Sequence, residues 1–295
     1  MPELPEVEVT RRELEPKLIG RTITEVATTK PSYFFITKPA ALRKHLVGRR
    51  AERLVRIGKY LLLELDDGAR VLLHLGMTGQ LFFSGAPSVR LMSALRGVSL
   101  TPEQQAAADG FTPDKHTHLV LSFDDDGPQL YFRDARKFGK VEWLAEGQVS
   151  KRLGKLGIDA LRAEGQALYT ASRKRKIPIK TVLLDQSVLA GVGNIYADEA
   201  LFIAKLHPLK RANKLRLEEC DALVAAVRKV MLRSIETGGS SISDYVRPDG
   251  ERGAYQDERK VYGRTGEPCH VCGTTIARKV LGQRSTHFCP HCQKR

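Results

Sequence analysis

The sequence predicts a multidomain α+β protein with a β-rich first domain, a helical second domain and a small metal-binding segment near the end. Three observations lead to this expectation. Alternating apolar stretches separated by Asp/Gly turns dominate the first part of the chain, which is typical of antiparallel strands. Helical periodicity follows from about Gly147, and paired cysteines stand in the last part. A chain of 295 residues is long for one domain, so two domains and a finger are expected.

The charge of the chain narrows the choice of partner. Lys and Arg number 48 against 34 Asp and Glu, which gives a formal net charge of +14. Such an excess favours a polyanionic partner, with nucleic acid first and a membrane surface second. No run of about 18 apolar residues is present, so no membrane span is expected. No signal peptide is recognised, and the single thiol of Cys220 fits a reducing compartment, so a cytoplasmic protein is expected.

The first domain is predicted to begin with a helix over residues 5–18, which starts among prolines and stops before Gly20. Hairpin turns are expected at Asp66-Asp67-Gly68 and at Asp124-Asp125-Asp126-Gly127. Strands are expected at residues 22–28, 60–65, 71–75, 119–123, 130–133 and 141–144. These elements together predict a β-sandwich or a flattened barrel.

The composition changes near Glu146. The clearest helix covers residues 217–235, contains the apolar-face residue Cys220 as a core thiol, and stops at Gly238-Gly239. Residues 240–256 are polar and are predicted to form a mobile loop. The predicted domains are 1–145, 146–240, a loop and linker over 241–260, and a zinc finger over 261–295.

Four cysteines form two C-x2-C pairs separated by sixteen residues, namely Cys269, Cys272, Cys289 and Cys292. This spacing predicts one closed, tetrahedral zinc site that folds the segment and leaves no open position for catalysis. The alternative is two disulfides in a secreted protein. Three histidines could substitute as ligands, although four thiolates already satisfy the ion: His270, His287 and His291.

The first residues carry a chemical possibility of their own. Removal of Met1 would expose the secondary amine of Pro2, and an α-amino group titrates near pH 8, so part of it is neutral at physiological pH. A neutral amine can attack an electrophilic carbon and form an iminium ion. The carboxylates of Glu3 and Glu6 could shuttle protons or stabilise a developing cation. The alternative is an ordinary helix start with Glu at the positive end of the dipole.

Six motifs stand in one order along the chain: Met1 to Glu8, Gly58 to Leu63, His74 to Gly79, Asp134 to Gly139, Gly191 to Ala197, and the cysteine pairs. Together they resemble the bacterial formamidopyrimidine-DNA glycosylase family, whose sister branch is endonuclease VIII. The resemblance covers nearly the whole chain. It implies an N-terminal β-sandwich, a helix-two-turns-helix domain and a C-terminal zinc finger. It also implies base excision repair, with excision of oxidised purines from duplex DNA followed by strand cleavage.

The resemblance implies catalytic roles for five residues. Pro2 would be the nucleophile that attacks C1′, Glu3 its acid/base partner, and Glu6 a supporting carboxylate. Lys59 would assist elimination near the sugar-phosphate; otherwise it is an exposed lysine at a strand start. Arg284, at the tip of the finger's hairpin, would contact the phosphate at the lesion; otherwise it is one more surface arginine.

Further residues would bind DNA. Met77, Arg136 and Phe138 resemble the family's wedge, which fills the hole left by a flipped nucleotide. Met77 and Phe138 could instead be core residues, but their loops are polar and rich in glycine. The wedge motif departs from other members at Ala135 and Lys137.

Phosphate contacts are implied for Asn194, which opens a helix after Gly191-Val192-Gly193, where a tight inter-helix turn is the alternative. The same positional transfer implies backbone contacts for His74, His116 and Arg175. The basic run around Arg175 would otherwise be only a solvated surface.

Two features favour the purine-specific branch: Leu4 in the Pro-Glu-Leu-Pro-Glu start, and the long segment from Gly238 to Tyr255, which would cover the everted base. Endonuclease VIII-type specificity and a non-catalytic zinc-finger DNA-binding protein are the alternatives. The expected partner is double-stranded DNA containing oxidised bases or abasic sites, bound by a monomer with one structural zinc. Residues 84–114 form a longer connection than usual, in which Thr101 could cap a short helix.

Overall fold

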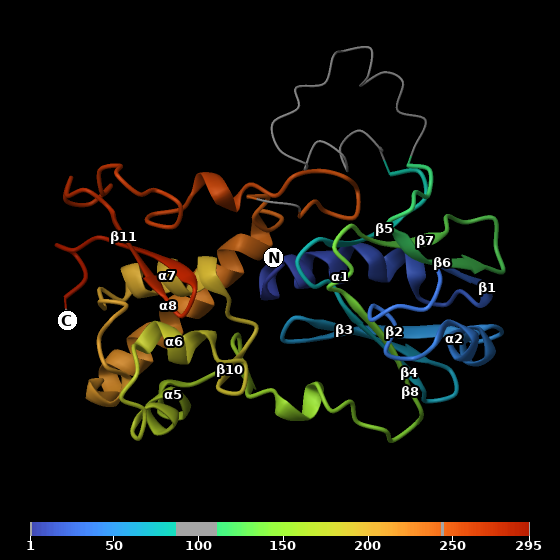
Figure 1. Cartoon of the computed structure of the whole chain (residues 1–295), viewed down its shortest axis with the longest axis horizontal. Helices are drawn as coiled ribbons and strands as arrows, with labels where there is room; N and C mark the ends of the chain where they lie inside the picture. The colour runs from blue at the N-terminus through green and yellow to red at the C-terminus, as the bar shows by residue number, and fades with distance from the viewer. Residues whose placement is uncertain (1, 87–110, 243–244, 295) are drawn as a thin grey trace, which may run out of the picture. The chain divides into compact units, whose positions relative to one another are not determined.

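The computed structural model describes residues 2–86, 111–242 and 245–294 (Figure 1). The chain divides into two compact units. The first consists of residues 1–150 and 237–256, and the second of residues 151–236 and 257–295. Among the described residues, no helix is long and apolar enough to cross a membrane. The predicted Thr101 helix and most of the 84–114 connection lie outside the described residues.

The first unit is built on two four-stranded antiparallel sheets. One has the order β1-β6-β7-β5 and the other the order β2-β3-β4-β8. The strands are β1 (Ile23–Thr28), β2 (Ala51–Ile57), β3 (Tyr60–Leu65), β4 (Arg70–His74), β5 (Gly79–Phe83), β6 (Thr117–Phe123), β7 (Leu130–Asp134) and β8 (Lys140–Leu144). The predicted β-sandwich is therefore confirmed, as are the hairpins β3–β4 and β6–β7 at the two Asp/Gly turns. Strands β2 and β5 were not predicted.

One apolar core joins the two sheets and two helices of the first unit. Helix α1 (Leu4–Leu18) packs against β2, β3 and β5, and helix α2 (Pro39–Leu46), which was not predicted, packs against β1. At the centre lie the fully buried rings of Phe34 and Phe132, whose centroids are 4.8 Å apart in an edge-on arrangement.

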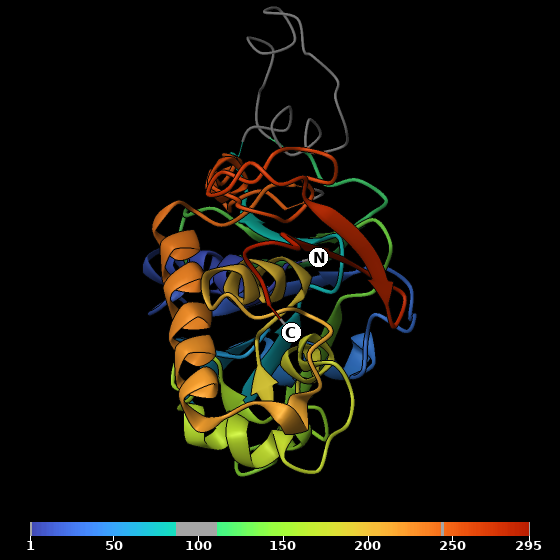
Figure 2. The same cartoon turned by 90° about the vertical axis from the view of Figure 1, so that its left-hand side faces the viewer.

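The second unit is mainly helical, with two short paired strands and a β-hairpin between the two cysteine pairs. Its elements are β9 (Ile158–Asp159), α5 (Gly165–Ser172), α6 (Ile179–Leu184), β10 (Leu189–Ala190), α7 (Asn194–Ile203), α8 (Leu217–Glu236), β11 (Ala277–Leu281) and β12 (Arg284–Phe288). Helix α8 packs against α5 and α7 (Figure 2). Cys220 lies in α8 with no exposed surface, so the predicted core thiol is confirmed, and burial raises its pKa to about 11.

The segment after α8 returns to the first unit. It has no helix or strand over residues 240–242 and 245–254, as the sequence predicted. Much of it is nevertheless buried, including Tyr245 and Val246 at 4% exposure each. We call residues 239–256 the α1 loop, because its hydrogen bonds and ion pairs reach α1.

We expect the Phe34–Phe132 pair to be a main source of stability in the first unit. Phe132→Ala should lower the free energy of unfolding by about 3–5 kcal/mol, because it removes a buried ring and leaves a cavity. Val47→Ala, at a position with 47% exposure, is the control and should change it by no more than about 0.5 kcal/mol. Urea unfolding followed by tryptophan fluorescence and circular dichroism measures both, and equal effects would contradict this description of the core.

Candidate active site

Pro2 directly precedes the first turn of α1 and is buried. Glu3 is the N-cap residue, and Glu6 stands three residues later. The two form a capping box, in which the Glu3 side chain accepts the backbone N–H of Glu6 while Glu6 Oε2 accepts the backbone N–H of Glu3 at 2.8 Å. Glu3 and Glu6 are only 3% and 1% exposed. The structure therefore brings both predicted carboxylates to the residue that would carry the amine.

The second oxygen of Glu6 reaches the α1 loop. Glu6 Oε1 accepts the backbone N–H of Ser240 at 2.9 Å. The neighbouring Gly239 has φ of +86°, and a Cβ there would lie 2.9 Å from the Tyr245 ring and 3.2 Å from Glu6 Cγ. Only glycine combines that backbone conformation with such close packing. One carboxylate thus fixes both the start of α1 and the start of the loop.

Lys59 lies in the two-residue turn between β2 and β3 and is 8% exposed. An ion pair from Arg56 Nε to Glu8 Oε2, at 3.0 Å, ties this hairpin to α1. Burial raises the pKa of Glu8, but hydrogen bonds from Arg11 and Arg12 and the charge of Arg56 outweigh it and hold the pKa below its usual range. Glu8 was not among the predicted site residues, although its arginines at i+3 and i+4 were a signal for it in the sequence.

The predicted wedge residues come from two neighbouring turns of the sandwich. The Met77 turn covers residues 75–78, between β4 and β5, and the Phe138 turn covers residues 135–139, between β7 and β8. Met77 lies between β4 and β5 and is half-buried, whereas Phe138 lies between β7 and β8 and is 42% exposed. Arg136 is exposed, and its guanidinium carbon lies 4.7 Å from the centroid of the Phe138 ring. His74 ends β4 with its ring 4.6 Å from that of Tyr60, and His116 lies just before β6.

The remaining predicted residues belong to the second unit. Arg284 is exposed at the start of β12, beside the turn of the β11–β12 hairpin. Asn194 opens α7, and its Nδ2 donates to the backbone oxygen of Ser285 at 3.0 Å. Its amide therefore holds the hairpin next to Arg284. Arg175 makes an ion pair with Asp185 at 2.6 Å and is partly exposed.

A buried ion pair that was not predicted lies beneath the same hairpin. Lys180 Nζ lies 2.7 Å from Asp198 Oδ1 and also donates to the backbone oxygen of Ser285 at 2.8 Å and to Thr286 Oγ1 at 2.9 Å. Asp198 Oδ2 accepts the backbone N–H of His287 at 2.8 Å. Both charged side chains are almost fully buried. Removing one partner would leave an uncompensated charge, so the pair fixes where the hairpin sits on α6 and α7.

The four paired cysteines come together at one point. Their sulfur atoms all lie within 4.8 Å of one another, with 4.0 Å between Cys269 and Cys292 and 3.5 Å between Cys272 and Cys289. Tetrahedral zinc with Zn–S bonds of about 2.3 Å requires sulfur separations of roughly 3.8 Å, so the donor set fits this ion. All four cysteines are free thiols, which is contrary to the disulfide alternative. His287 bonds to Asp198 instead of joining the cluster.

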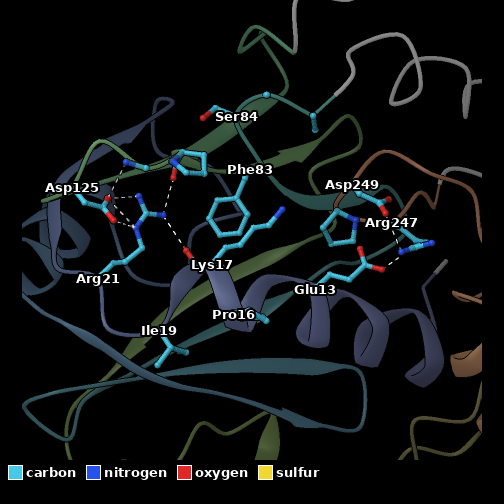
Figure 3. Close-up of a pocket in the computed structure, with 15 residues that line it drawn as sticks. Glu13, Pro16, Lys17, Ile19, Arg21, Phe83, Ser84, Asp125, Arg247 and Asp249 are labelled. Carbon is cyan, nitrogen blue, oxygen red and sulfur yellow. Dashed lines mark hydrogen bonds and ion pairs between the residues drawn. The ribbon is translucent and has the colours of Figure 1, made fainter.

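A cavity of about 850 Å³ lies in the first unit, along the C-terminal half of α1 (Figure 3). Arg21 pairs with Asp125 at one end, and Arg247 pairs with Glu13 at the other. Glu13 is ten residues beyond Glu3, which is about 15 Å along a helix axis. Neither Pro2 nor Glu3 lines this cavity, so we do not assign it to the candidate chemistry.

Models of one protein family match most of the chain. The family models of the formamidopyrimidine-DNA glycosylase N-terminal domain, of its H2TH domain, and of the zinc finger found in FPG and IleRS match residues 1–141, 156–246 and 266–295. Formamidopyrimidine-DNA glycosylases of Solibacter usitatus and Geobacter sulfurreducens are 40% and 41% identical to this chain, over the full length of both proteins. The chain belongs to the formamidopyrimidine-DNA glycosylase family.

Solved structures of family members agree with this assignment. The MutM (FPG) protein of Thermus thermophilus superimposes with a TM-score of 0.82 at 37% identity, covering 99% of this chain and 98% of that one. A MutM solved with DNA containing carbocyclic 8-oxo-G gives a TM-score of 0.83 at 35% identity over both full chains. The predicted fold class and the structural zinc site are thereby confirmed.

The zinc site generates a prediction. Purified protein should contain one zinc per chain, and Cys289→Ser should lose it, because three thiolates no longer close the tetrahedron. Cys220→Ala is the matched control, since this thiol lies in α8 outside the cluster, and it should keep the metal. Elemental analysis of the three proteins measures the result. Absence of zinc from the wild-type protein, or equal loss in both variants, would contradict the assignment.

Proposed function

We propose that this protein is a bifunctional DNA glycosylase and abasic-site lyase that excises oxidised purines from duplex DNA in base excision repair. The observation that carries the proposal is the start of α1, where the capping box of Glu3 and Glu6 adjoins Pro2. Family membership and the net charge of +14 agree with a DNA substrate.

Pro2 acts as the nucleophile once Met1 has been removed. Its neutral amine attacks C1′ of the damaged nucleotide, the N-glycosidic bond breaks, and the base leaves with the bonding electrons. Opening of the sugar ring then gives an iminium ion at C1′, and Glu3 protonates the ring oxygen that is released. The iminium acidifies the C2′ proton, so β-elimination expels the 3′ phosphate and δ-elimination then expels the 5′ phosphate.

The other residues hold substrate and catalyst. Glu6 fixes the backbone of Glu3, Lys59 assists elimination beside the sugar-phosphate, and Arg284 contacts the phosphate at the lesion. Met77, Arg136 and Phe138 fill the space left by the everted nucleotide and face its former partner base. Phosphate contacts come from His74, His116, Arg175 and Asn194. Zinc holds the finger together and takes no part in the chemistry.

Several relatives have been solved with relevant DNA. These include a MutM with DNA containing carbocyclic 8-oxo-G and the Lactococcus lactis protein with abasic-site DNA. We therefore propose double-stranded DNA with oxidised or missing bases as the partner of this chain, bound by a monomer in the cytoplasm.

A second specificity deserves a test because the Lactococcus lactis relative has also been solved with DNA containing an oxidised pyrimidine. Leu4 and the long α1 loop favour purines here. Side-by-side excision of thymine glycol and of 8-oxoguanine paired with cytosine ranks the two substrates. Faster removal of thymine glycol would move the assignment to endonuclease VIII-type specificity.

The nucleophile generates the first functional prediction. Pro2→Gly should retain part of the lyase activity, because its primary amine can still form an imine. A protein with an acetylated N-terminus should form no covalent adduct with abasic DNA under borohydride. A gel-shift assay of the trapped adduct measures both. Full trapping by the acetylated protein would exclude Pro2 as the nucleophile. If the wild-type protein formed no trapped adduct, it would be a DNA-binding protein without this chemistry.

A second functional prediction concerns the α1 loop. Arg247 makes ion pairs with Glu13 at 2.6 Å and with Asp249 at 2.9 Å, on the wall of the cavity in Figure 3. Because these ion pairs hold the loop to α1 beside the cavity, Arg247→Ala should loosen the loop where it is proposed to cover the base. Excision of 8-oxoguanine should fall about two- to fivefold, the size expected of a half-buried ion pair.

Cleavage at a ready-made abasic site should change less in Arg247→Ala, because no base is present for the loop to touch. Arg21→Ala is the matched control, since it breaks an ion pair at the other end of the same cavity without touching the loop. If Arg247→Ala slowed both reactions equally, the loop would be a structural element and would not recognise the base.

A further inference from the structure

The two turns that carry the proposed wedge share one buried carboxylate. Asp134, at the end of β7, has no exposed surface. Its Oδ1 accepts the hydroxyl of Thr78 at 2.5 Å and the backbone N–H of Arg136 at 3.2 Å, and its Oδ2 accepts the backbone N–H of Gly139 at 2.6 Å. Thr78 belongs to the Met77 turn, whereas Arg136 and Gly139 flank Phe138. Asp134 therefore joins both turns directly.

The hydroxyl of Thr78 makes two hydrogen bonds, one to the Phe138 turn and one to Asp134 at its start. Its Oγ1 donates to Asp134 and at the same time accepts the backbone N–H of Arg136 at 3.2 Å. Thr78 is 8% exposed, so these bonds have little competition from water. The hydroxyl is the only side-chain group of the Met77 turn, among the described contacts, that bonds to the other turn.

The backbones of the two turns also touch. Gly76 has φ of +64°, and a Cβ there would lie 2.5 Å from the carbonyl carbon of Phe138 and from the nitrogen of Gly139. A Cβ at Gly139 would in turn lie 2.9 Å from the backbone oxygen of His74. Side chains at either position would force the turns apart, so the glycines permit the contact that the hydroxyl and the carboxylate then hold.

The Phe138 turn needs the support of these contacts, because its backbone is strained at one residue. Lys137 has φ of +59°, a conformation that non-glycine residues adopt only at some cost in energy. Tyr33 supports the turn from outside by donating its hydroxyl to the backbone oxygen of Arg136 at 2.8 Å. His118 supports it from inside through Nε2 and the backbone oxygen of Asp134, 2.9 Å apart, and burial lowers the pKa of this histidine.

We propose that Thr78 and Asp134 are positioning residues that lock the two turns into a single rigid wedge, so that Met77, Arg136 and Phe138 enter the DNA stack together. Asp134 has no exposed surface and Thr78 is only 8% exposed, so both would act through the turns and not by contact with DNA. Without the lock, each turn samples its own positions, and the wedge no longer matches the hole left by one nucleotide. This inference rests on the proposed function, because the wedge has a role only if a nucleotide is everted.

Thr78→Val tests the lock, since valine has nearly the same shape and lacks the hydroxyl. Thr78→Ser keeps the hydroxyl and should rescue. The matched control is Thr37→Val, which removes a hydroxyl that accepts the backbone N–H of Trp143 at 2.9 Å in the same unit, away from both turns. Asp134→Asn is a second variant, because an amide has one acceptor oxygen and cannot accept both the N–H of Gly139 and the bonds from Thr78 and Arg136.

Each protein is assayed for excision of 8-oxoguanine from duplex DNA and for cleavage of a single-stranded abasic oligonucleotide, in which there is no stack to fill. Thr78→Val should lower duplex excision on the order of 10- to 100-fold, the usual effect of misplaced groups of this kind. Single-strand cleavage should change no more than about twofold. Thr78→Ser and Thr37→Val should stay within about threefold of wild type in both assays.

A structural readout accompanies the kinetics. With 2-aminopurine beside an abasic-site analogue in duplex DNA, wild type should raise the fluorescence by unstacking the probe, and Thr78→Val should raise it much less. Equal losses of duplex and single-strand activity would mean a general folding defect and overturn the proposal, as would unchanged duplex activity in both Thr78→Val and Asp134→Asn. If wild type forms no trapped adduct, the catalytic proposal fails, while the fluorescence still tests the wedge.

Discussion

The carboxylate of Glu6 is the group on which the arrangement of the first unit most depends. It is 1% exposed, and its two oxygens accept the backbone N–H groups of Glu3 and Ser240. A buried carboxylate is tolerated only when such donors satisfy it. Because one donor opens α1 and the other begins the α1 loop, the same group fixes the residue next to the amine of Pro2 and the segment proposed to cover the base.

The same principle recurs at other proposed functional residues. The Arg56–Glu8 pair ties the turn of Lys59 to α1, and the Lys180–Asp198 pair holds the hairpin of Arg284. Lys59 and Arg284, which are proposed to contact DNA, both lie in or beside the turn of a hairpin. In each case a buried ion pair next to that turn fixes its position. Preorganisation of this kind is what proximity and electrostatic catalysis require, since groups that must be ordered during the reaction contribute less.

Much of the fold follows from local sequence, because Asp/Gly turns and alternating apolar residues determine hairpins without help from distant parts of the chain. The four zinc ligands could also be predicted from the sequence, because two C-x2-C pairs at this separation are typical of a tetrahedral zinc site. Strand β2 was missed because Arg53 and Arg56 interrupt its alternation and are accommodated by ion pairs to other elements. Helix α2 was missed because eight residues give too few turns for a clear period.

The candidate site was predictable only in part. Glu3 and Glu6 lie close to Pro2 in the sequence. They are also three residues apart, which is the spacing of a capping box at the start of a helix. The contact between Glu6 and Ser240 joins residues 234 positions apart, and that between Lys180 and Ser285 joins residues 105 apart. No local pattern encodes such pairs, because they arise only when separate elements pack.

The central claim is that the amine of Pro2, held at the start of α1, is the group that bonds to the sugar. Its most direct test is proteolysis of the borohydride-trapped complex followed by mass spectrometry of the modified peptide. The account predicts that the sugar remnant is attached to the nitrogen of Pro2 in a peptide that begins with Pro2. A remnant on Lys59 or another lysine, or a trapped protein that still carries Met1, would contradict it.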